Sequence, residues 1–562
     1  MSGRRRGASA VLIAVAVLCS GCLAIPSGGP VQEVEAAQED STTAVYQPAP
    51  PAPGADPQEI VSGFLDAQLA YPPSTGVAEQ FLTPEAADRW NPSTGTLVYA
   101  EPDVGPSLSD ARSGQRVDLE VERVLSLDAA GRVVETGGSA TRSFRLARVG
   151  QEWRLSSVPD GLLVSRKFHD DYYRAFDVFF FDQAAERLAP SVVHHPIGEQ
   201  LATSLVTSLA RGPRDESAQL RTFLPGLSDV RPSVPLTADG IAEVELGSAV
   251  AELEVVEQGK LAAQLVRTLQ QVPGITGVRI SSGGSPITPD DRSVQPVRSW
   301  SQYVPRPGVE GPYALVDGAA VELVGRTARE VPDVWGVDPT ASRLAVGSRR
   351  VATASAAGDA VAVRSRAGGE VVALGASDVL ALSWVTGEEL LVVDRPGTVP
   401  RVRALRDAAL REVGGASLPA GTTSFATSPD GARYALTVGD TVRLGPLVRE
   451  DGVVARLGPA RTIPWDVRAT GSVAWVDGSR LAFLTATDLG VQVAEGRIDG
   501  TGLEIAGTGG RPVLPDVDAN RLVATGDQRW AVDARRRLWY LGSRAVWTRP
   551  DLGAVRSLSP GP

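Results

Sequence analysis

The feature that most constrains the fold is a repeat in the C-terminal half of the chain. Five segments share one pattern, in which a polar turn with Asp or Gly precedes an apolar strand. Aligned on one apolar residue each, they centre on Leu344, Leu390, Tyr434, Leu481 and Leu522, at intervals of 41 to 47 residues. A period of about 40–50 residues with several strands per unit indicates a β-propeller. Further apolar strands near 313–316 and 321–324 bring the expected count to five or six blades.

Two recurring features accompany the repeats. A strand ending in an aromatic residue is expected upstream of four of them, at Trp335, Trp384, Phe425 and Trp475. The turns carry aspartates, namely Asp338, Asp430, Asp477 and Asp518. Aspartate side chains at turns accept hydrogen bonds from nearby backbone N–H groups. We therefore expect these four to cap blade turns rather than to bind a metal.

Composition fits short strands joined by many turns. The 562 residues include 59 Gly and 41 Pro, with 43% hydrophobic residues and only 5% aromatic ones. The formal net charge is -11. Phosphate contact needs clustered positive charge, so we expect no nucleic-acid partner. An acidic chain is also repelled by anionic lipid, so membrane attachment requires a separate anchor.

The N-terminus has the form of an export signal, predicted over residues 1–21. Three arginines at 4–6 precede an apolar stretch at 8–18, which is too short to span a bilayer. Small residues then precede Cys22, which resembles the lipobox of bacterial lipoproteins. The resemblance implies a diacylglycerol on the sulfur of Cys22 and an acyl group on its amine. Cys19 stands where an apolar residue is usual, and the alternative is a secretory signal cleaved near Ala24.

Residues 22–57 are predicted to be an acidic, Pro-rich tether. They contain four acidic residues between 33 and 40 and five prolines between 48 and 57, without an apolar period. Such a segment spans roughly 30 Å by coil scaling. It is expected to hold the first folded domain clear of the lipid.

Residues 58–165 change from a helical to a strand pattern. Two short helices are expected, the second over 81–90 with Thr83 as its N-cap. Alternating stretches follow at 117–121, 143–147 and 150–155, and Trp153 is expected in the core. Helices followed by an antiparallel meander resemble domains of the nuclear transport factor 2 and cystatin type.

Residues 168–300 are predicted to form a compact α+β domain. A strand is expected over 175–181, and leucines at helical spacing predict helices near 201–209 and 261–269. These stretches resemble the GerMN domain of sporulation and germination proteins. Gln264 and Arg267 are expected on a solvated helix face.

Residues for catalysis are scarce, and we predict no enzyme activity, cofactor or metal. Both cysteines lie within the first 22 residues, and the three histidines are His169, His194 and His195. The adjacent pair lacks a metal-binding spacing and is expected in a surface loop. Sequence motifs of serine hydrolases, zinc proteases and P-loop proteins are absent. A glycosidase with two carboxylates stays open, because sequence does not define their separation.

The complete order of parts resembles the LpqB lipoproteins of actinobacteria. The most specific parts of the match are Cys22 with Ile25-Pro26, within residues 22–31, and the GerMN-like stretch at 261–280, whereas the C-terminal repeats are generic. The resemblance implies an accessory role beside the MtrAB two-component system, through contact with the extracellular part of the MtrB sensor kinase. It also implies a part in cell-envelope homeostasis and division.

The resulting prediction is a lipid-anchored protein on the outer face of the plasma membrane, with mixed α+β and all-β domains. Its parts are a signal peptide at 1–21, a tether at 22–57, a helix-plus-meander domain at 58–165, a GerMN-like domain at 168–300 and a propeller at 310–562. The alternative function is binding of peptidoglycan or another wall glycan, with or without hydrolysis.

Overall fold

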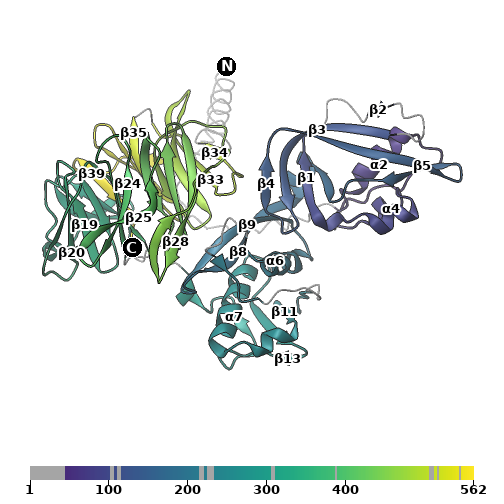
Figure 1. Cartoon of the computed structure of the whole chain (residues 1–562), viewed down its shortest axis with the longest axis horizontal. Helices are drawn as coiled ribbons and strands as arrows, with labels where there is room; N and C mark the ends of the chain where they lie inside the picture. The colour runs from purple at the N-terminus through teal and green to yellow at the C-terminus, as the bar shows by residue number, and fades with distance from the viewer. Residues whose placement is uncertain are drawn as a thin grey trace, which may run out of the picture. The chain divides into compact units, whose positions relative to one another are not determined.

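The computed structural model describes most of the chain from Val45 onward. The described residues are 45–100, 107–109, 116–213, 220–224, 233–304, 311–385, 389–505, 512–515, 518–542 and 546–562. All of them belong to the unit Val45–Pro562 (Figure 1). Cys22, the predicted signal peptide and most of the tether lie outside the described residues.

The first region places short helices against a mixed sheet. The helices are α2 (Pro57–Ala67), α3 (Gly76–Glu79), α4 (Pro84–Arg89) and the 3-10 turn η1 (Pro92–Thr94). The strands are β1 (Gly95–Tyr99), β2 (Ser107–Ser109), β3 (Arg116–Asp128), β4 (Val133–Thr136), β5 (Ser139–Val149), β6 (Glu152–Ser157) and β7 (Leu162–Ser165). Their order is β6-β5-β3-β1-β7, with β2 and β4 beside β3.

Local sequence explains how these helices begin. The Asp56 carboxylate accepts from the backbone N–H groups of Gln58 and Glu59 at the start of α2. Thr83 accepts from the Ala86 N–H at the start of α4, as predicted. The predicted antiparallel meander is confirmed in β3, β5 and β6. The parallel pairing of β7 with β1 was not predicted.

The second region contains a β-hairpin and two helices that pack on it. Its elements are α5 (Arg166–Tyr172), β8 (Tyr173–Asp182), β9 (Leu188–Pro196), α6 (Leu201–Ala210), β10 (Leu220–Arg221), β11 (Ile241–Leu246), η3 (Ser248–Glu252), α7 (Val255–Leu269), β12 (Gly277–Ser282), β13 (Ser285–Pro286), β14 (Gln295–Pro296) and η4 (Ser301–Tyr303). The strands form the sheets β10-β8-β9 and β11-β12, with β13 and β14 beside β12. The strand and both helices predicted here are confirmed.

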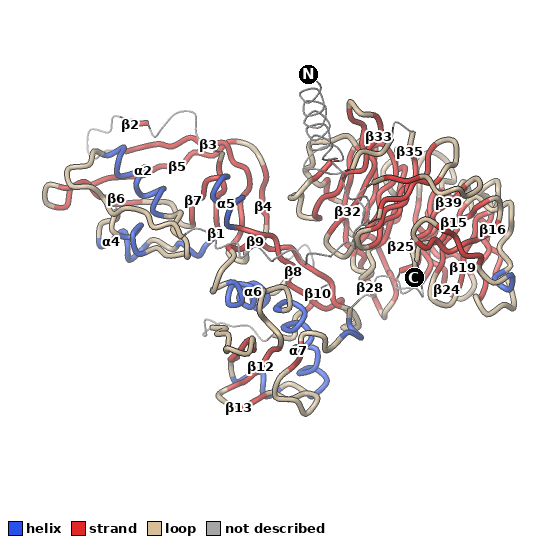
Figure 2. Tube along the Cα trace, turned by 180° about the vertical axis from the view of Figure 1, so that it is seen from behind, coloured by secondary structure: helices blue, strands red, loops and turns tan. Residues whose placement is uncertain are grey.

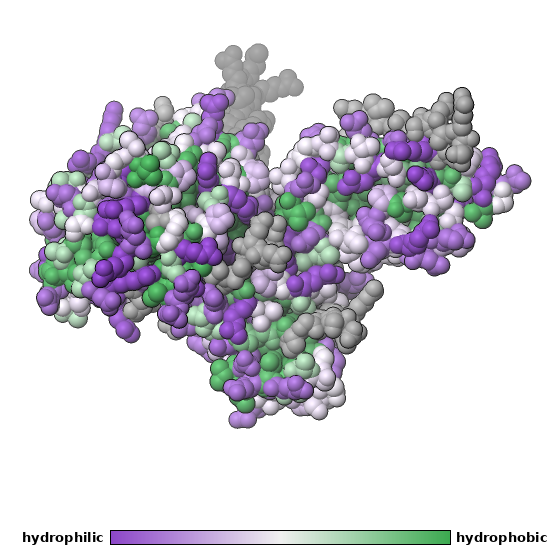
Figure 3. Space-filling model, viewed as in Figure 1, coloured by the Kyte–Doolittle hydropathy of each residue, from purple (hydrophilic) through white to green (hydrophobic). Residues whose placement is uncertain are grey.

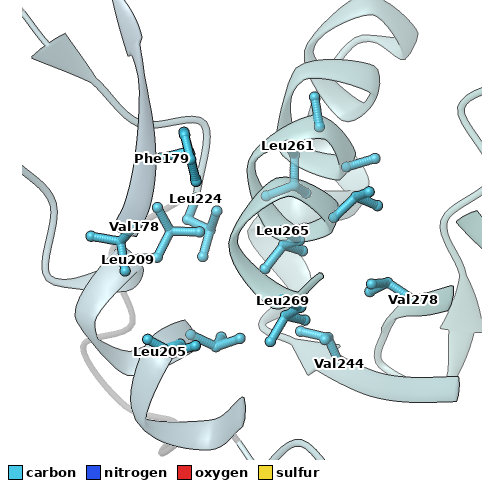
Figure 4. Packing of buried hydrophobic residues seen from close by; sticks show 14 of the residues in the cluster. Val178, Phe179, Leu205, Leu209, Leu224, Val244, Leu261, Leu265, Leu269 and Val278 are labelled. Atoms are coloured by element: carbon cyan, nitrogen blue, oxygen red, sulfur yellow. The ribbon is translucent and has the colours of Figure 1, made fainter. Parts of the chain in front are cut away.

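Helix α7 forms the centre of this core. Its leucines face β8 and α6 on one side and strands β11 and β12 on the other (Figure 4). The labelled members are Val178, Phe179, Leu205, Leu209, Leu224, Val244, Leu261, Leu265, Leu269 and Val278. Leu261, Leu265 and Leu269 are completely buried. The i, i+4, i+8 spacing read from the sequence is therefore the buried stripe of the helix.

The third region (Figure 2) consists, among the described residues, of four four-stranded sheets and one nine-stranded sheet. The nine-stranded sheet contains two blades, which the parallel pairing of β25 with β29 joins at Gly414 and Arg456, so the region has six blades. The first blade contains β15 (Tyr313–Val316), β16 (Ala319–Val324), β17 (Thr327–Glu330) and β39 (Val555–Ser559). The second contains β18 (Arg343–Val346), β19 (Arg350–Ala354), β20 (Ala360–Ser365) and β21 (Val372–Gly375). The third contains β22 (Val379–Val385), β23 (Glu389–Asp394), β24 (Arg401–Arg406) and β25 (Ala409–Ser417). The fourth blade contains β26 (Thr422–Thr427), β27 (Arg433–Val438), β28 (Thr441–Glu450) and β29 (Val453–Leu457), with β30 (Arg461–Thr462) beside β28. The fifth contains β31 (Ala469–Trp475), β32 (Arg480–Thr487), β33 (Gly490–Arg497) and β34 (Glu504–Ile505). The sixth contains β35 (Ala519–Thr525), β36 (Gln528–Asp533), β37 (Leu538–Leu541) and β38 (Trp547–Thr548). This agrees with the predicted propeller of five or six blades.

The last strand of the chain closes the ring. β39 pairs antiparallel with β15, and it packs against both β18 and β35. The hydroxyls of Ser557 and Ser559 on β39 also accept from the backbone N–H groups of Leu344 and Val346 on β18. The first blade is therefore built from both ends of the repeat region, and its inner strand is the C-terminal one.

The repeat as aligned in the sequence mixes two structural positions. Leu344 and Leu522 lie on inner strands, β18 and β35, whereas Leu390, Tyr434 and Leu481 lie on the second strand of their blades. The aromatic strand ends Trp384, Phe425 and Trp475 do lie on inner strands. The expectation for Trp335 was wrong, because it lies in the 3-10 turn η5 (Asp333–Trp335).

Candidate functional site: the histidine junction

All three histidines of the chain lie together where the hairpin β8–β9 meets its neighbours. His169 is on α5, and His194 and His195 are adjacent on β9. The rings of His169 and His194 have centroids 5.8 Å apart, and His169 stacks on Tyr173 at 5.2 Å. We call this group, with Asp499 and Ser208, the histidine junction.

His194 connects the hairpin to the propeller. Its Nε2 lies 2.9 Å from a carboxylate oxygen of Asp499, and the two side chains are only 5% and 11% exposed. The Thr501 hydroxyl and backbone N–H both donate to the other Asp499 oxygen, at 2.8 and 3.0 Å. Asp499 follows β33, so residues about 300 positions apart share one buried polar contact.

His195 faces the opposite side of β9 and connects to the first region. Its Nε2 lies 2.7 Å from the hydroxyl oxygen of Ser208 on α6. That hydroxyl donates to the backbone oxygen of Ala130, in the turn between β3 and β4, at 2.7 Å. Next to it, the N–H of His194 donates to the backbone oxygen of Gly131 at 2.7 Å.

Gly131 is required at this contact. Its φ is +79°, and a Cβ added there would lie 2.7 Å from the backbone oxygen of His194. Only glycine adopts this backbone conformation without strain and allows such a close approach. The sequence predicted the turn that contains Gly131, but it did not predict that this glycine contacts His194.

The prediction that His194 and His195 lie in a surface loop was wrong. They are strand residues, and His194 is buried. Neighbouring residues of a strand point to opposite faces, so one histidine reaches the propeller and the other reaches α6. Periodicity did not reveal this, because both faces of β9 are covered.

Further contacts join the hairpin to the propeller. The Ser479 hydroxyl donates to the Asp177 carboxylate at 3.0 Å, and the Arg433 guanidinium donates to the backbone oxygen of Pro190 at 2.7 Å. Val192 of β9 belongs to the same apolar cluster as the blade of β31–β33. Polar and apolar contacts together make the hairpin part of both cores.

Burial controls the ionisation of the junction. It lowers the pKa of His195 to about 4 and lowers the pKa of His169 as well. Burial acts to raise the pKa of Asp499, but hydrogen bonds from His194 and Thr501 outweigh it and lower that pKa overall. Burial raises the pKa of Asp177. The site thus favours a neutral His195 on one face of β9 and an ionised Asp499, next to His194, on the other.

Of the two residues expected on a solvated helix face, Gln264 is buried and Arg267 is half-buried. Gln264 is fully buried, accepts from the Phe223 N–H at 2.7 Å and donates to the Phe179 oxygen at 2.8 Å. The Arg267 guanidinium lies over the Phe179 ring, and burial lowers its pKa. Both residues therefore support β8 rather than face a ligand. Trp153 packs on the core of the first region, as expected.

The turn aspartates act as predicted in three blades. Asp338, Asp430 and Asp477 each accept from a backbone N–H two residues later, at 2.7–2.9 Å. For Asp518 the contact is made by its backbone oxygen, which accepts from Ala534. Within the described ranges, no group of three or more His, Cys, Asp or Glu residues is placed to hold a metal ion. No helix in the described part of the chain has the length and apolar character needed to span a bilayer.

Two family models match the regions that meet at the junction. Residues 50–170 match the N-terminal domain of lipoprotein LpqB, and residues 177–288 match a domain of sporulation and spore germination proteins. A "Lipoprotein LpqB" of Cutibacterium acnes is 29% identical over 88% of this chain and 89% of its own length. The chain contains an LpqB N-terminal domain and is similar to LpqB lipoproteins over most of its length. The LpqB protein of Streptomyces coelicolor is 27% identical over 89% of this chain and 90% of that protein.

The match to LpqB proteins covers the propeller as well as the first two regions. A solved structure of TolB from Acinetobacter baumannii has 12% identity and a TM-score of 0.33, covering 55% of this chain and 86% of that one. The name lipoprotein, shared by the LpqB relatives, indicates a membrane-anchored protein. Lipidation at Cys22 and the domain boundaries remain predictions.

Proposed function

We propose that this LpqB-like protein is anchored by lipid at Cys22 on the outer face of the plasma membrane. There it binds the extracellular part of a sensor histidine kinase of the MtrB type and modulates its output in cell-envelope homeostasis and division. Support comes from the similarity to LpqB lipoproteins and from the histidine junction. The role is that of a binding protein rather than of an enzyme.

The junction is the observation that carries this proposal. Its members His194, His195, Asp499 and Ser208 form hydrogen bonds with one another or with backbone groups, and these bonds hold three regions to one hairpin. Polar networks that are satisfied in this way make a fold rigid and specific. A platform of fixed geometry is what a protein needs if it recognises a large partner surface.

Charge and anchoring define how such binding would behave. The chain carries a net charge of -11, which favours a basic patch on the partner. Charges at the rim of an interface mainly affect the association rate and its salt dependence. Attachment to the same membrane raises the effective concentration, so that a weak contact becomes well populated.

The test compares anchored and secreted protein in cells. We expect the wild-type chain to modulate kinase output, whereas Cys22→Ala, secreted at an equal level, does not. In vitro, the purified chain should bind the sensor's extracellular domain weakly and lose binding as salt rises. Equal signalling by both forms, or no saturable binding at low salt, would contradict the proposal.

The alternative of a wall-glycan hydrolase receives less support from the described residues. A pocket of about 270 Å³ in the propeller is lined by arginines and by one carboxylate, Asp533. A glycosidase needs two carboxylates across the scissile bond. Cosedimentation with purified sacculi, or release of soluble fragments from them, would favour the alternative.

A further inference from the structure

The propeller pocket lies where three inner strands begin. It is formed at the first residues of β18, β35 and β39 and at the turn between β36 and β37. Its volume is about 270 Å³. Four arginines line it, namely Arg343, Arg521, Arg536 and Arg556. In a chain with a net charge of -11, four guanidinium groups around one cavity are a local reversal of charge.

Arg521 is half-buried and, in the described part of the chain, has no counter-charge close to it. Among the described residues its guanidinium forms no hydrogen bond or ion pair with protein groups. Burial lowers its pKa to about 10, and the charges of Arg343 and Arg536 act in the same direction. A buried cation without a counter-charge destabilises a fold. Such a group is expected where a ligand supplies the missing charge.

The carboxylate in the pocket is not that counter-charge. One Asp533 oxygen accepts from the backbone N–H groups of Arg535 and Arg537, both at 2.9 Å. The other accepts from the Arg537 side chain at 2.7 Å and from the Trp539 indole N–H at 3.1 Å. Asp533 is therefore occupied in shaping the β36–β37 turn.

That turn holds Arg536 in an unusual conformation. Its φ is +63°, in the left-handed region that favours glycine. The backbone oxygen of Arg536 accepts from Val555 at the start of β39, at 2.8 Å, which secures the turn beside the pocket. Local strain of this kind is often found at functional sites. Here the strained position holds an arginine, the fourth cation of the pocket, although glycine would adopt this φ with less strain.

The other two arginines keep donors available. Arg343 donates to the backbone oxygens of Leu380 and Ser342, at 3.3 and 3.1 Å, and Arg556 donates from one nitrogen to Pro339 at 3.0 Å. A guanidinium has five N–H donors, so both can still bind an anion. Ser342 and Asn520 line the same space and add neutral polar groups.

We propose that this pocket binds the phosphate group of a small phosphate-bearing ligand, held by Arg343, Arg521 and Arg536. Planar guanidinium groups bind phosphate oxygens in pairs, and a dianion compensates more charge than one carboxylate does. The polar residues beside the arginines suit a hydroxyl-bearing remainder such as a sugar or glycerol. The proposal does not depend on kinase binding.

Thermal unfolding and calorimetry test this with inorganic phosphate and glycerol 3-phosphate as probes. The full chain, purified in detergent, is measured against sodium chloride of equal ionic strength. Both probes should raise the melting temperature by several degrees and saturate with concentration. Tighter binding of glycerol 3-phosphate than of inorganic phosphate would show that the organic remainder is also recognised, and equal binding would assign the affinity to the phosphate group.

Matched variants keep the test decisive. Arg521→Gln should abolish the phosphate-dependent shift and leave the melting temperature without phosphate unchanged or higher, because repulsion is removed. Arg536→Gln gives a second reading if the first variant folds poorly, and it should lose at least tenfold in affinity. Arg411→Gln, at an exposed arginine on β25, is the control and should bind normally. No saturable shift in wild type, or an equal shift in Arg521→Gln, would overturn the proposal.

Discussion

At the scale of single residues, environment decides what the polar groups do. His195 and Gln264 belong to polar residue types, yet inside the fold His195 contacts the Ser208 hydroxyl and Gln264 binds backbone groups. Ionisable groups in such positions make stability depend on pH. His195 is the clearest case, because the pKa of its ring in the fold is about 4.

We expect stability to fall between pH 6.5 and pH 4 because of His195. An unfolded histidine has a pKa of about 6.5, so the unfolded chain takes up a proton first, and the free energy of unfolding decreases as pH falls. The loss is at most about 3 kcal/mol. Urea unfolding of wild type and His195→Gln at pH 7.5 and 4.5 measures it.

The glutamine variant should lose less stability than wild type over that interval. Glutamine can still donate to Ser208, but it does not titrate. If both proteins lost the same free energy, other groups would control the acid response.

Residue-level prediction succeeded where the cause was local. Thr83 followed by Pro84 is a cap signal within one turn, and the structure has that cap. The histidine pair and Gln264 depend on partners far along the chain, such as Asp499 and Phe179. No periodicity identifies such partners, so these residues were assigned to the surface.

At the scale of elements, the propeller depends on contacts between neighbouring blades. The pair Arg529–Glu495 joins β36 to β33, with distances of 2.6 and 2.9 Å and both side chains about 5% exposed. The repeat period was readable because each blade uses the same turn and strand. The sequence did not show whether a repeat falls on the inner or on the second strand of its blade, since both strands are apolar.

Arg529→Met should destabilise the propeller by about 3–5 kcal/mol, because it leaves a buried carboxylate without its cation. The double variant Arg529→Met with Glu495→Leu should recover most of that loss. Arg279→Met removes an exposed ion pair with Glu243 and serves as the control, with an expected effect below about 1 kcal/mol. Denaturant unfolding measures all three, and a small effect of Arg529→Met alone would contradict the assigned role.

Deletion of β39 should open the ring. A chain ending at Ala554 leaves β15 with a free edge and removes the buried Val555 and the two serine contacts to β18. Free strand edges favour aggregation. Light scattering and melting temperature measure this, with deletion of Gly561 and Pro562 as the control. A monomeric truncated chain with an unchanged melting temperature would show that closure is unnecessary.

At the scale of the whole molecule, the hairpin β8–β9 shares its contacts among three regions. On the face shown in Figure 3, polar and apolar residues are interspersed, and the exposed large apolar residues there and elsewhere in the described chain are mostly isolated valines. If a partner is recognised by apolar contacts spread over several regions, those regions must keep fixed positions relative to one another. The junction is therefore the place where the molecule is most sensitive to a single change.

Asp499→Ala should separate unfolding of the propeller from that of the hairpin region. It leaves His194 buried without its carboxylate partner, at a cost of about 1–3 kcal/mol. Calorimetry should then show two transitions in place of one. Asp488→Ala, at an exposed position on the same blade, should leave a single transition. A single unshifted transition in Asp499→Ala would show that the contact does not couple the regions.

The pairing of β15 with β39 also has a consequence in time. Tyr313 lies opposite Ser559, so the first blade is completed only when a strand far along the chain has been made. At about 5–20 residues per second, the ribosome needs on the order of ten seconds or more between the two. During that interval β15 lacks its inner neighbour β39, and the ring that contains the five other blades stays open. A chain that stops before β39 therefore has an incomplete propeller, with a free edge at β15.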